Sequence, residues 1–164
     1  INPSLNLEVA RLAKQAGVTV VLIPAPVEKV SDELLALSDV LILNQHECAI
    51  LGGNTDLNLS AKTLSTGRTL VLTLGADGAE LYKAGQLMGQ FAAPKVRAVD
   101  TTGAGDCFAG SYISARASGR DEQSAIKFAV AAASLSVEKK GAAESMPGFD
   151  DVIKRMGERN AEGY

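Results

Sequence analysis

Short apolar runs rich in β-branched residues alternate with segments of helical periodicity, and this alternation constrains the fold more than any other feature of the sequence. Residues 18–23, 40–43 and 69–74 have the nearly unbroken apolar pattern of strands that are covered on both faces. Helical periodicity with start and stop signals precedes each run, over residues 4–16, 31–37 and 56–64. The alternation predicts an α/β fold with a parallel sheet, in which 18–23 is an interior strand. The strand order stays open.

The second half of the chain has a different pattern. A hairpin is predicted from strands at 79–83 and 87–91 around Ala84 and Gly85, followed by a short strand at 96–99. Helices are expected over roughly 104–118, 122–138 and 149–159, and small residues dominate two of them. The helix at 4–16 leads into a buried strand, yet the strand that precedes such a helix in a βαβ unit is missing. We therefore expect a truncated chain.

Length and charge exclude several classes of protein. A chain of 164 residues predicts one domain, spanning residues 1–164. The net charge of −3 and the lack of a dense Lys/Arg run argue against nucleic acid and anionic membranes as partners. No stretch approaches the roughly 18 apolar residues of a membrane span. Two distant cysteines and one histidine lack zinc-site spacing, so free thiols and a cytoplasmic location are expected.

The segment Asp100-Thr-Thr-Gly-Ala-Gly-Asp106 carries the strongest chemical signal. It lies between a predicted strand and a predicted helix, where backbone N–H groups form an anion site and glycine lets a phosphate approach. A carboxylate at Asp106 would repel that anion, unless it accepts a proton from the group that attacks the anion. The alternative is an acid that complements the helix dipole. Phe108 breaks the dinucleotide fingerprint, and a Gly-Lys-Ser/Thr P-loop is absent.

Two further motifs have a plain structural interpretation. Asn44 and Glu47 have the spacing of a helix N-cap with a capping-box acid. Gly75 and Gly78 have the spacing of an ordinary hairpin turn. His46 is interpreted as a surface residue and Cys107 as a small packed residue, so neither is proposed as a nucleophile.

Together these segments resemble the ribokinase-like carbohydrate kinases, also called the phosphofructokinase B family. Residues 100–113 are similar to the C-terminal signature of that family, with Ser111 as a mild departure. The resemblance extends over essentially the whole chain and follows the family's order. It includes Pro24-Ala25-Pro26, residues 32–37, Asn44-Gln45-His46-Glu47, residues 73–78 and Lys140-Gly141-Ala142.

The resemblance implies a three-layer α/β/α, Rossmann-like fold that lacks the family's N-terminal strands and β lid. It implies transfer of the γ-phosphoryl of ATP to a sugar hydroxyl, with ribose as the expected acceptor. Asp106 would be the catalytic base, and the backbone amides of Gly103, Ala104, Gly105 and Asp106 would form the anion hole.

The resemblance also implies cofactors and the residues that hold them. Asn44 and Glu47 would position Mg²⁺ and phosphates, largely through water. The nucleotide would be bound by Thr73, Leu74, Gly75, Ala76, Asp77, Gly78 and Gly105, with Val130 near the adenine. A K⁺ site would take the Asp100 carboxylate, the Ser145 hydroxyl, and the carbonyls of Thr102, Ser136, Lys139 and Gly141.

Two departures from the family leave alternatives open. Ile23 stands where Asn is usual in this family, so the acceptor could be fructose, a nucleoside or another sugar. Family members are longer, and their N-terminal part supplies most sugar contacts and the lid, through which a homodimer is expected. The isolated chain is therefore expected to be inactive. A non-catalytic nucleotide-binding or regulatory module is the alternative.

Overall fold

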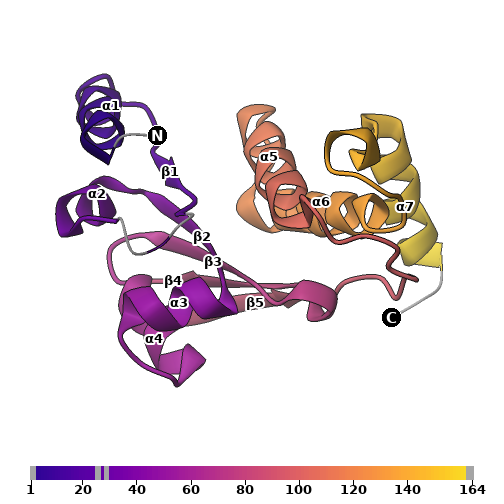
Figure 1. Ribbon diagram of the computed structural model, residues 1–164, viewed down its shortest axis with the longest axis horizontal. Coiled ribbons are helices and arrows are strands. Elements are labelled where there is room, and N and C mark those ends of the chain that lie inside the picture. Colours follow the sequence, from indigo (N-terminus) through magenta and orange to yellow (C-terminus); the bar gives the residue numbers. More distant parts are fainter. Residues whose placement is uncertain (1–2, 25–26, 28–29, 162–164) are drawn as a thin grey trace. The chain divides into compact units, whose positions relative to one another are not determined.

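The computed structural model describes residues 3–24, 27 and 30–161, and the chain forms two compact units (Figure 1). The first unit comprises residues 1–74 and 80–89, and the second comprises 75–79 and 90–164. The single domain expected from the chain length stays a prediction. Ala25 and Pro26 of the proline motif lie outside the described residues.

The first unit is built on a five-stranded sheet. In the order of the sheet, its strands are β1 (Val21–Leu22), β2 (Val40–Asn44), β3 (Thr69–Thr73), β4 (Ala79–Lys83) and β5 (Gln86–Phe91), the last of which runs on into the second unit. Strands β1, β2 and β3 are parallel. The predicted parallel α/β arrangement is thereby confirmed.

Four helices connect or flank these strands, namely α1 (Pro3–Gln15), α2 (Asp32–Leu37), α3 (Gln45–Gly52) and α4 (Leu57–Leu64). The first residues of two predicted helices, Ser31 and Asp56, act as N-caps. The Ser31 hydroxyl accepts a hydrogen bond from the amide of Leu34 at 3.2 Å, and an Asp56 carboxylate oxygen accepts one from Asn58 at 2.9 Å. The sequence pattern predicted α1, α2 and α4, whereas α3 followed only from the capping interpretation of Asn44.

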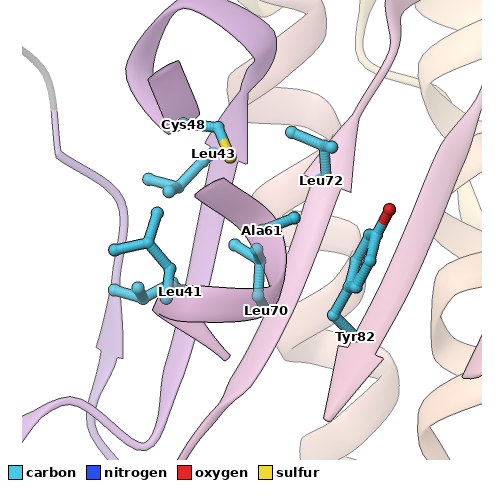
Figure 2. Packing of buried hydrophobic residues seen from close by; sticks show 8 residues of the cluster. Leu41, Leu43, Cys48, Ala61, Leu70, Leu72 and Tyr82 are labelled. Atoms are coloured by element: carbon cyan, nitrogen blue, oxygen red, sulfur yellow. The ribbon is translucent and has the colours of Figure 1, made fainter. Parts of the chain in front are cut away.

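An apolar cluster fixes the register of the central strands (Figure 2). Alternate residues of β2 and β3 point to one face of the sheet and meet residues of α3, α4 and β4. The buried members are Leu41, Leu43, Leu70, Leu72, Cys48, Ala61, Leu64 and Tyr82. A shift by one residue would turn these leucines away from the cluster. The register therefore holds Asn44 opposite Thr73 where the two strands end.

Two of the predicted strands differ in the structure. The parallel strand expected at 18–23 is confirmed only over two residues, as β1, and its predicted interior position is wrong because β1 lies at the edge of the described sheet. Val18 and Ile23 are 56% and 42% exposed. Residues 96–99 form no strand, since the amide of Val99 donates to the carbonyl of Val137 at 2.7 Å instead of to a neighbouring strand.

The predicted hairpin is confirmed, with strands β4 and β5 next to each other in the sheet. Its two-residue turn has positive φ at both positions, 48° at Ala84 and 73° at Gly85. Two successive positive φ angles are typical of the type I′ turn, which matches the twist of the flanking strands.

The described residues of the second unit form three α-helices and two short 3₁₀ segments. They are α5 (Ala104–Ala117), α6 (Glu122–Ser136), α7 (Phe149–Ala161), η2 (Gly75–Asp77) and η3 (Ala143–Ser145). Helix α6 packs against both α5 and α7. Most of its residues are buried, and four of them are alanines between 125 and 132 that allow neighbours to approach closely. The three predicted helices are confirmed. No helix in the described part of the chain could span a membrane.

Candidate functional site

In the first unit, the parallel strands β2 and β3 end side by side at Asn44 and Thr73. Asn44 is exposed and Thr73 is half-buried, with its hydroxyl 3.3 Å from the carbonyl of Leu43 as a hydrogen-bond donor. In open α/β sheets, ligands bind beyond the carboxyl ends of the strands. Two of the residues assigned to the nucleotide and its metal thus lie at an edge where ligands are expected.

The pair Asn44 and Glu47 forms a complete capping box at the start of α3. The Asn44 Oδ1 atom accepts from the amide of Glu47 at 2.9 Å, and the Glu47 Oε2 atom accepts from the amide of Asn44 at 2.8 Å. The structural interpretation of this motif is therefore correct. The capping bonds involve neither the second carboxylate oxygen of Glu47 nor the side-chain Nδ2 atom of Asn44.

The loop that follows β3 depends on two glycines with positive φ, 61° at Gly75 and 104° at Gly78. The amide of Gly78 donates to the carbonyl of Gly75 at 3.2 Å and closes the 3₁₀ turn. Ala76 and Asp77 are exposed at its tip, whereas Leu74 packs against the apolar cluster of the first unit. The loop therefore presents backbone rather than bulky side chains at its tip.

In the second unit, α5 begins without a side-chain cap. Gly103 is its N-cap residue and has a φ of 76°. The amide of Ala104 donates to Thr101 at 3.2 Å and that of Cys107 to Gly103 at 2.8 Å, but the amides of Gly105 and Asp106 have no acceptor within the described part of the chain. A side chain at Gly105 would meet no atom within 4 Å. These two N–H groups are open to an anion.

Asp106 lies in the first turn of α5 and is exposed. Its neighbours along the helix, Cys107 and Phe108, are buried and hold this turn in place. An exposed carboxylate in the same turn as two open amides can exchange a proton with a group bound at the helix end.

Asp100 connects two segments of the second unit. One carboxylate oxygen accepts from the amide of Thr102 and the other from the amide of Gly141, both at 3.0 Å. The bond from Gly141, followed by those from Thr102, lowers the pKa of Asp100 to about 2. The backbone continues the connection, because the carbonyl of Val137 accepts from the amides of Val99 and Asp100. We call these contacts the Asp100 latch.

The residues assigned to K⁺ belong to the segments that the Asp100 latch joins. Ser136 and Ser145 are buried, at 2% and 1% exposure. The hydroxyl of Ser145 donates to the carbonyl of Ala142 at 2.8 Å, and the carbonyl of Ser136 accepts from the amide of Lys139 at 3.3 Å. Every proposed ligand is an oxygen, and an oxygen can bind a cation while it takes part in a hydrogen bond.

The exposure of three other residues named in the sequence analysis bears on their predicted roles. Val130 is 3% exposed within α6, so its side chain belongs to the packing of that helix. His46 is exposed, and Cys107 is buried with a pKa that burial raises. The predicted surface position of His46 and the predicted packed position of Cys107 are confirmed.

Sequence reasoning missed two sets of contacts near the Asp100 latch. They are the hydrogen bonds to the carbonyl of Val137 and the ion pair between Glu138 and Arg155. The carbonyl of Val137 anchors the Asp100 loop, and any residue type could supply it. Glu138 and Arg155 are separated by 17 positions, so no local pattern marks them as partners. Only the packing of α7 on α6 brings the two charges together.

Comparison with known proteins identifies the family. Residues 1–148 match the pfkB family carbohydrate kinases. The chain is 40% identical to ribokinase of Haemophilus influenzae over 154 residues, which cover 88% of this chain and 49% of that protein. It is 33% identical to ribokinase of Lactococcus lactis over 159 residues, which cover 97% of this chain and 52% of that protein.

A solved structure confirms the fold. Arabidopsis thaliana ribokinase complexed with ribose and ATP is similar with a TM-score of 0.85 at 33% identity, over 95% of this chain and 53% of that chain. The chain spans about half the length of the curated relatives it matches. The predicted ribokinase fold is thus confirmed, and this chain belongs to the pfkB family of carbohydrate kinases.

Proposed function

We propose that the protein to which this chain belongs transfers the γ-phosphoryl group of ATP to a hydroxyl of a sugar, with ribose as the first candidate. The observation that carries the proposal is the start of α5, where the open amides of Gly105 and Asp106 lie in the same turn as an exposed carboxylate. Its relative from Arabidopsis thaliana was solved with ribose and ATP, which supports both substrates.

The chain's own residues would act on the transferring group through charge and position. The amides of Gly105 and Asp106, at the positive end of the α5 dipole, stabilise the negative charge of the phosphoryl group. Gly103 lets the chain enter the helix in the left-handed conformation, and the absence of a side chain at Gly105 leaves room for the phosphate. Fixed dipoles of this kind are the main source of rate enhancement in phosphoryl transfer.

The Asp106 carboxylate would accept the proton of the attacking sugar hydroxyl. A negative side chain next to an anion site opposes anion binding, so its presence needs a chemical reason. Proton transfer supplies that reason, because the proton of the attacking hydroxyl moves to the carboxylate as the new O–P bond forms and the bond to ADP breaks, and the carboxylate thereby loses its negative charge. The module without catalytic activity has no use for this carboxylate.

The donor sets fit the two metal ions that the family implies. Glu47 keeps one oxygen outside the capping box, and the described residues contain no cluster of three acidic, His or Cys side chains. Mg²⁺, which neutralises phosphate charge, usually keeps most of its waters and needs few protein ligands. The oxygens of Asp100, Ser145 and the adjoining carbonyls suit K⁺, which would hold the two joined segments together.

We further propose that the isolated chain binds adenine nucleotide weakly and phosphorylates no sugar. The phosphate-binding turn and the loop at 75–78 are present, whereas the chain has only about half the length of its relatives. Positioning of both substrates and exclusion of water contribute much of the rate enhancement of such enzymes. We also propose that the complete protein is a homodimer.

The test is ADP release by the complete reading frame and by this chain, with ATP and Mg²⁺ and a panel of ribose, fructose, a nucleoside and a phosphosugar. We expect the complete protein to prefer one acceptor and this chain to release no ADP above background. Nucleotide binding without ADP release by the complete protein, for every acceptor, would instead support the regulatory module. Ordinary kinase rates in the isolated chain would refute its proposed inactivity.

A further inference from the structure

We propose that Arg155 of α7 is a positioning residue for the Asp100 latch, and that it acts through Glu138. In this proposal, Arg155 of α7 holds Glu138 in the segment after α6. That segment in turn holds the loop before α5 in place. The catalytic consequence of this proposal rests on the proposed function, whereas its effect on the backbone of this chain does not.

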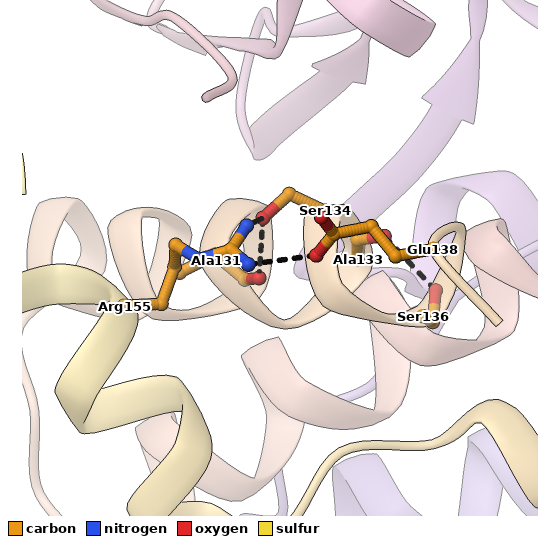
Figure 3. A network of polar contacts seen from close by, with 6 residues as sticks. All are labelled: Ala131, Ala133, Ser134, Ser136, Glu138 and Arg155. Carbon is orange, nitrogen blue, oxygen red and sulfur yellow. Dashed lines mark hydrogen bonds and ion pairs between the residues drawn. The ribbon is translucent and has the colours of Figure 1, made fainter. Parts of the chain in front are cut away.

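The contact between Arg155 and Glu138 is close and partly buried (Figure 3). The Arg155 Nη2 atom donates to the Glu138 Oε2 atom at 2.7 Å, and Nη1 lies 3.4 Å from the Ser134 hydroxyl oxygen, which itself donates to the carbonyl of Ala131. The two charged side chains are 20% and 35% exposed. Water and salt screen such a pair less than an exposed one.

The chain has an ion pair of the same kind that serves as a comparison. Arg11 of α1 and Glu33 of α2 are 2.6 Å apart, but both side chains are 52% exposed. Exposed pairs of this kind contribute little to stability. The pair of Arg155 also lies beside the last turn of α6, where a cation interacts favourably with the helix dipole.

Glu138 lies between the two points at which the Asp100 latch holds its segment. The residue before it, Val137, accepts through its carbonyl from the amides of Val99 and Asp100. Three residues after it, the amide of Gly141 donates to the Asp100 carboxylate. A carboxylate fixed at position 138 therefore restricts the backbone between these two anchors.

Helix α7 has other contacts that keep it on the unit without this ion pair. Val152 is 2% exposed, and the ring of Phe149 lies 5.6 Å from that of Phe128 of α6. Arg120 lies 5.3 Å from the centre of the Phe128 ring and 6.0 Å from that of Phe149. Loss of the Arg155 side chain should therefore release residues 137–141 while α7 stays in place.

A looser segment at 137–141 would alter the start of α5. Gly141 would donate less often to Asp100, and Asp100 also holds the amide of Thr102, directly before the N-cap Gly103. The direction of the open amides at Gly105 and Asp106 depends on this turn. Catalysis by fixed dipoles is sensitive to small changes in their orientation.

Amide hydrogen exchange of this chain, followed by NMR, tests the proposal without any assay of activity. In R155M and in E138Q we expect the amides of Gly141 and Thr102 to exchange about tenfold faster, as expected when a charged hydrogen bond that restrains them is lost. The double variant should exchange no faster than either single one. R155K should restore part of the protection, and R11M should change neither amide.

Two results would overturn the proposal. One is exchange of the Gly141 and Thr102 amides at the wild-type rate in R155M. The other is an equal loss of protection at Val152, which would mean that Arg155 merely anchors α7. In the complete protein, R155M should lower kcat about tenfold and leave the KM for the sugar unchanged. If the complete protein has no kinase activity, the proposed function fails while the exchange result stands.

Discussion

Gly78 is the glycine whose replacement by alanine should destabilise the protein most clearly. A Cβ atom there would lie 1.9 Å from the carbonyl oxygen of Phe91, 2.7 Å from the amide nitrogen of Ala93 and 2.9 Å from the carbonyl carbon of Ala92. All three are backbone atoms, and ordinary van der Waals contact begins at 3.4 Å. The chain at 91–93 must therefore move before alanine fits.

The cost has two parts. A φ of 104° is strained for any residue with a side chain, at roughly 1–2 kcal/mol. Forcing the backbone at 91–93 aside adds about 1–3 kcal/mol, as other overpacked sites do. We therefore expect Gly78→Ala to lower the free energy of unfolding by about 3 kcal/mol, and the midpoint temperature by roughly 6–12 °C for a chain of this length.

Two glycines in the same candidate site provide matched controls. Gly75 has a φ of 61° but nothing within 4 Å of its Cβ position, so Gly75→Ala should cost only the backbone strain, about 1 kcal/mol. Gly105 lies in the first turn of α5 with neither positive φ nor a neighbour within 4 Å, so Gly105→Ala should not lower the midpoint and should raise it slightly. Urea and thermal unfolding measure all three. A Gly78→Ala protein as stable as Gly75→Ala would refute the steric reasoning.

Three further predictions concern the second unit. In the complete protein, Asp106→Asn should reduce kcat on the order of 10²- to 10⁴-fold and leave the Kd for nucleotide nearly unchanged, because it removes proton transfer and not binding; a variant that keeps most of its kcat would place the base elsewhere. The complete protein should turn over faster in K⁺ than in Na⁺ or Tris buffers, and Asp100→Ala should abolish that difference and lower kcat; equal rates in all buffers would remove the cation from the proposal. The pKa of Asp100 is about 2 in the folded chain, below the ordinary value near 3.9, so its stabilising contribution is complete above about pH 4 and is lost as the pH falls towards 2. Urea midpoints of Asp100→Asn should therefore change less with pH than those of wild type in this window, and parallel curves would contradict the bond from Gly141.

Periodicity predicted the elements that have a local cause. Helices α5, α6 and α7 were placed within about two residues at most ends, because caps and apolar spacing are properties of the segment itself. The turn at Ala84 and Gly85 followed from its two small residues. Residues 96–99 have the composition of a strand, but the amide of Val99 donates to the carbonyl of Val137, which is distant in the sequence. No property of the segment alone reveals that partner.

The edge position of β1 illustrates the same limit. Residues 18–23 are as apolar as the interior strands, and composition cannot tell whether a neighbour pairs on one side or on both. In the candidate site, amides open to an anion were predicted at the start of α5. Those of Gly105 and Asp106 have no acceptor in the described part of the chain, whereas that of Ala104 donates to Thr101. Asp100 and Gly141 are 41 positions apart. The family resemblance placed both residues in one cation site, but it did not predict the hydrogen bond between them.

A structural and a functional role are compatible for both Asp100 and Glu47. Each side chain accepts hydrogen bonds from backbone amides at the start of a turn or helix, which is a structural role. A carboxylate has about four acceptor positions, however, and the bonds to Thr102 and Gly141 occupy two of those on Asp100. The same bonds that cap the turn also fix the direction of the remaining lone pairs. A side chain held in this way is better prepared to bind a cation than one that is free to rotate, so a capping bond does not argue against a functional role.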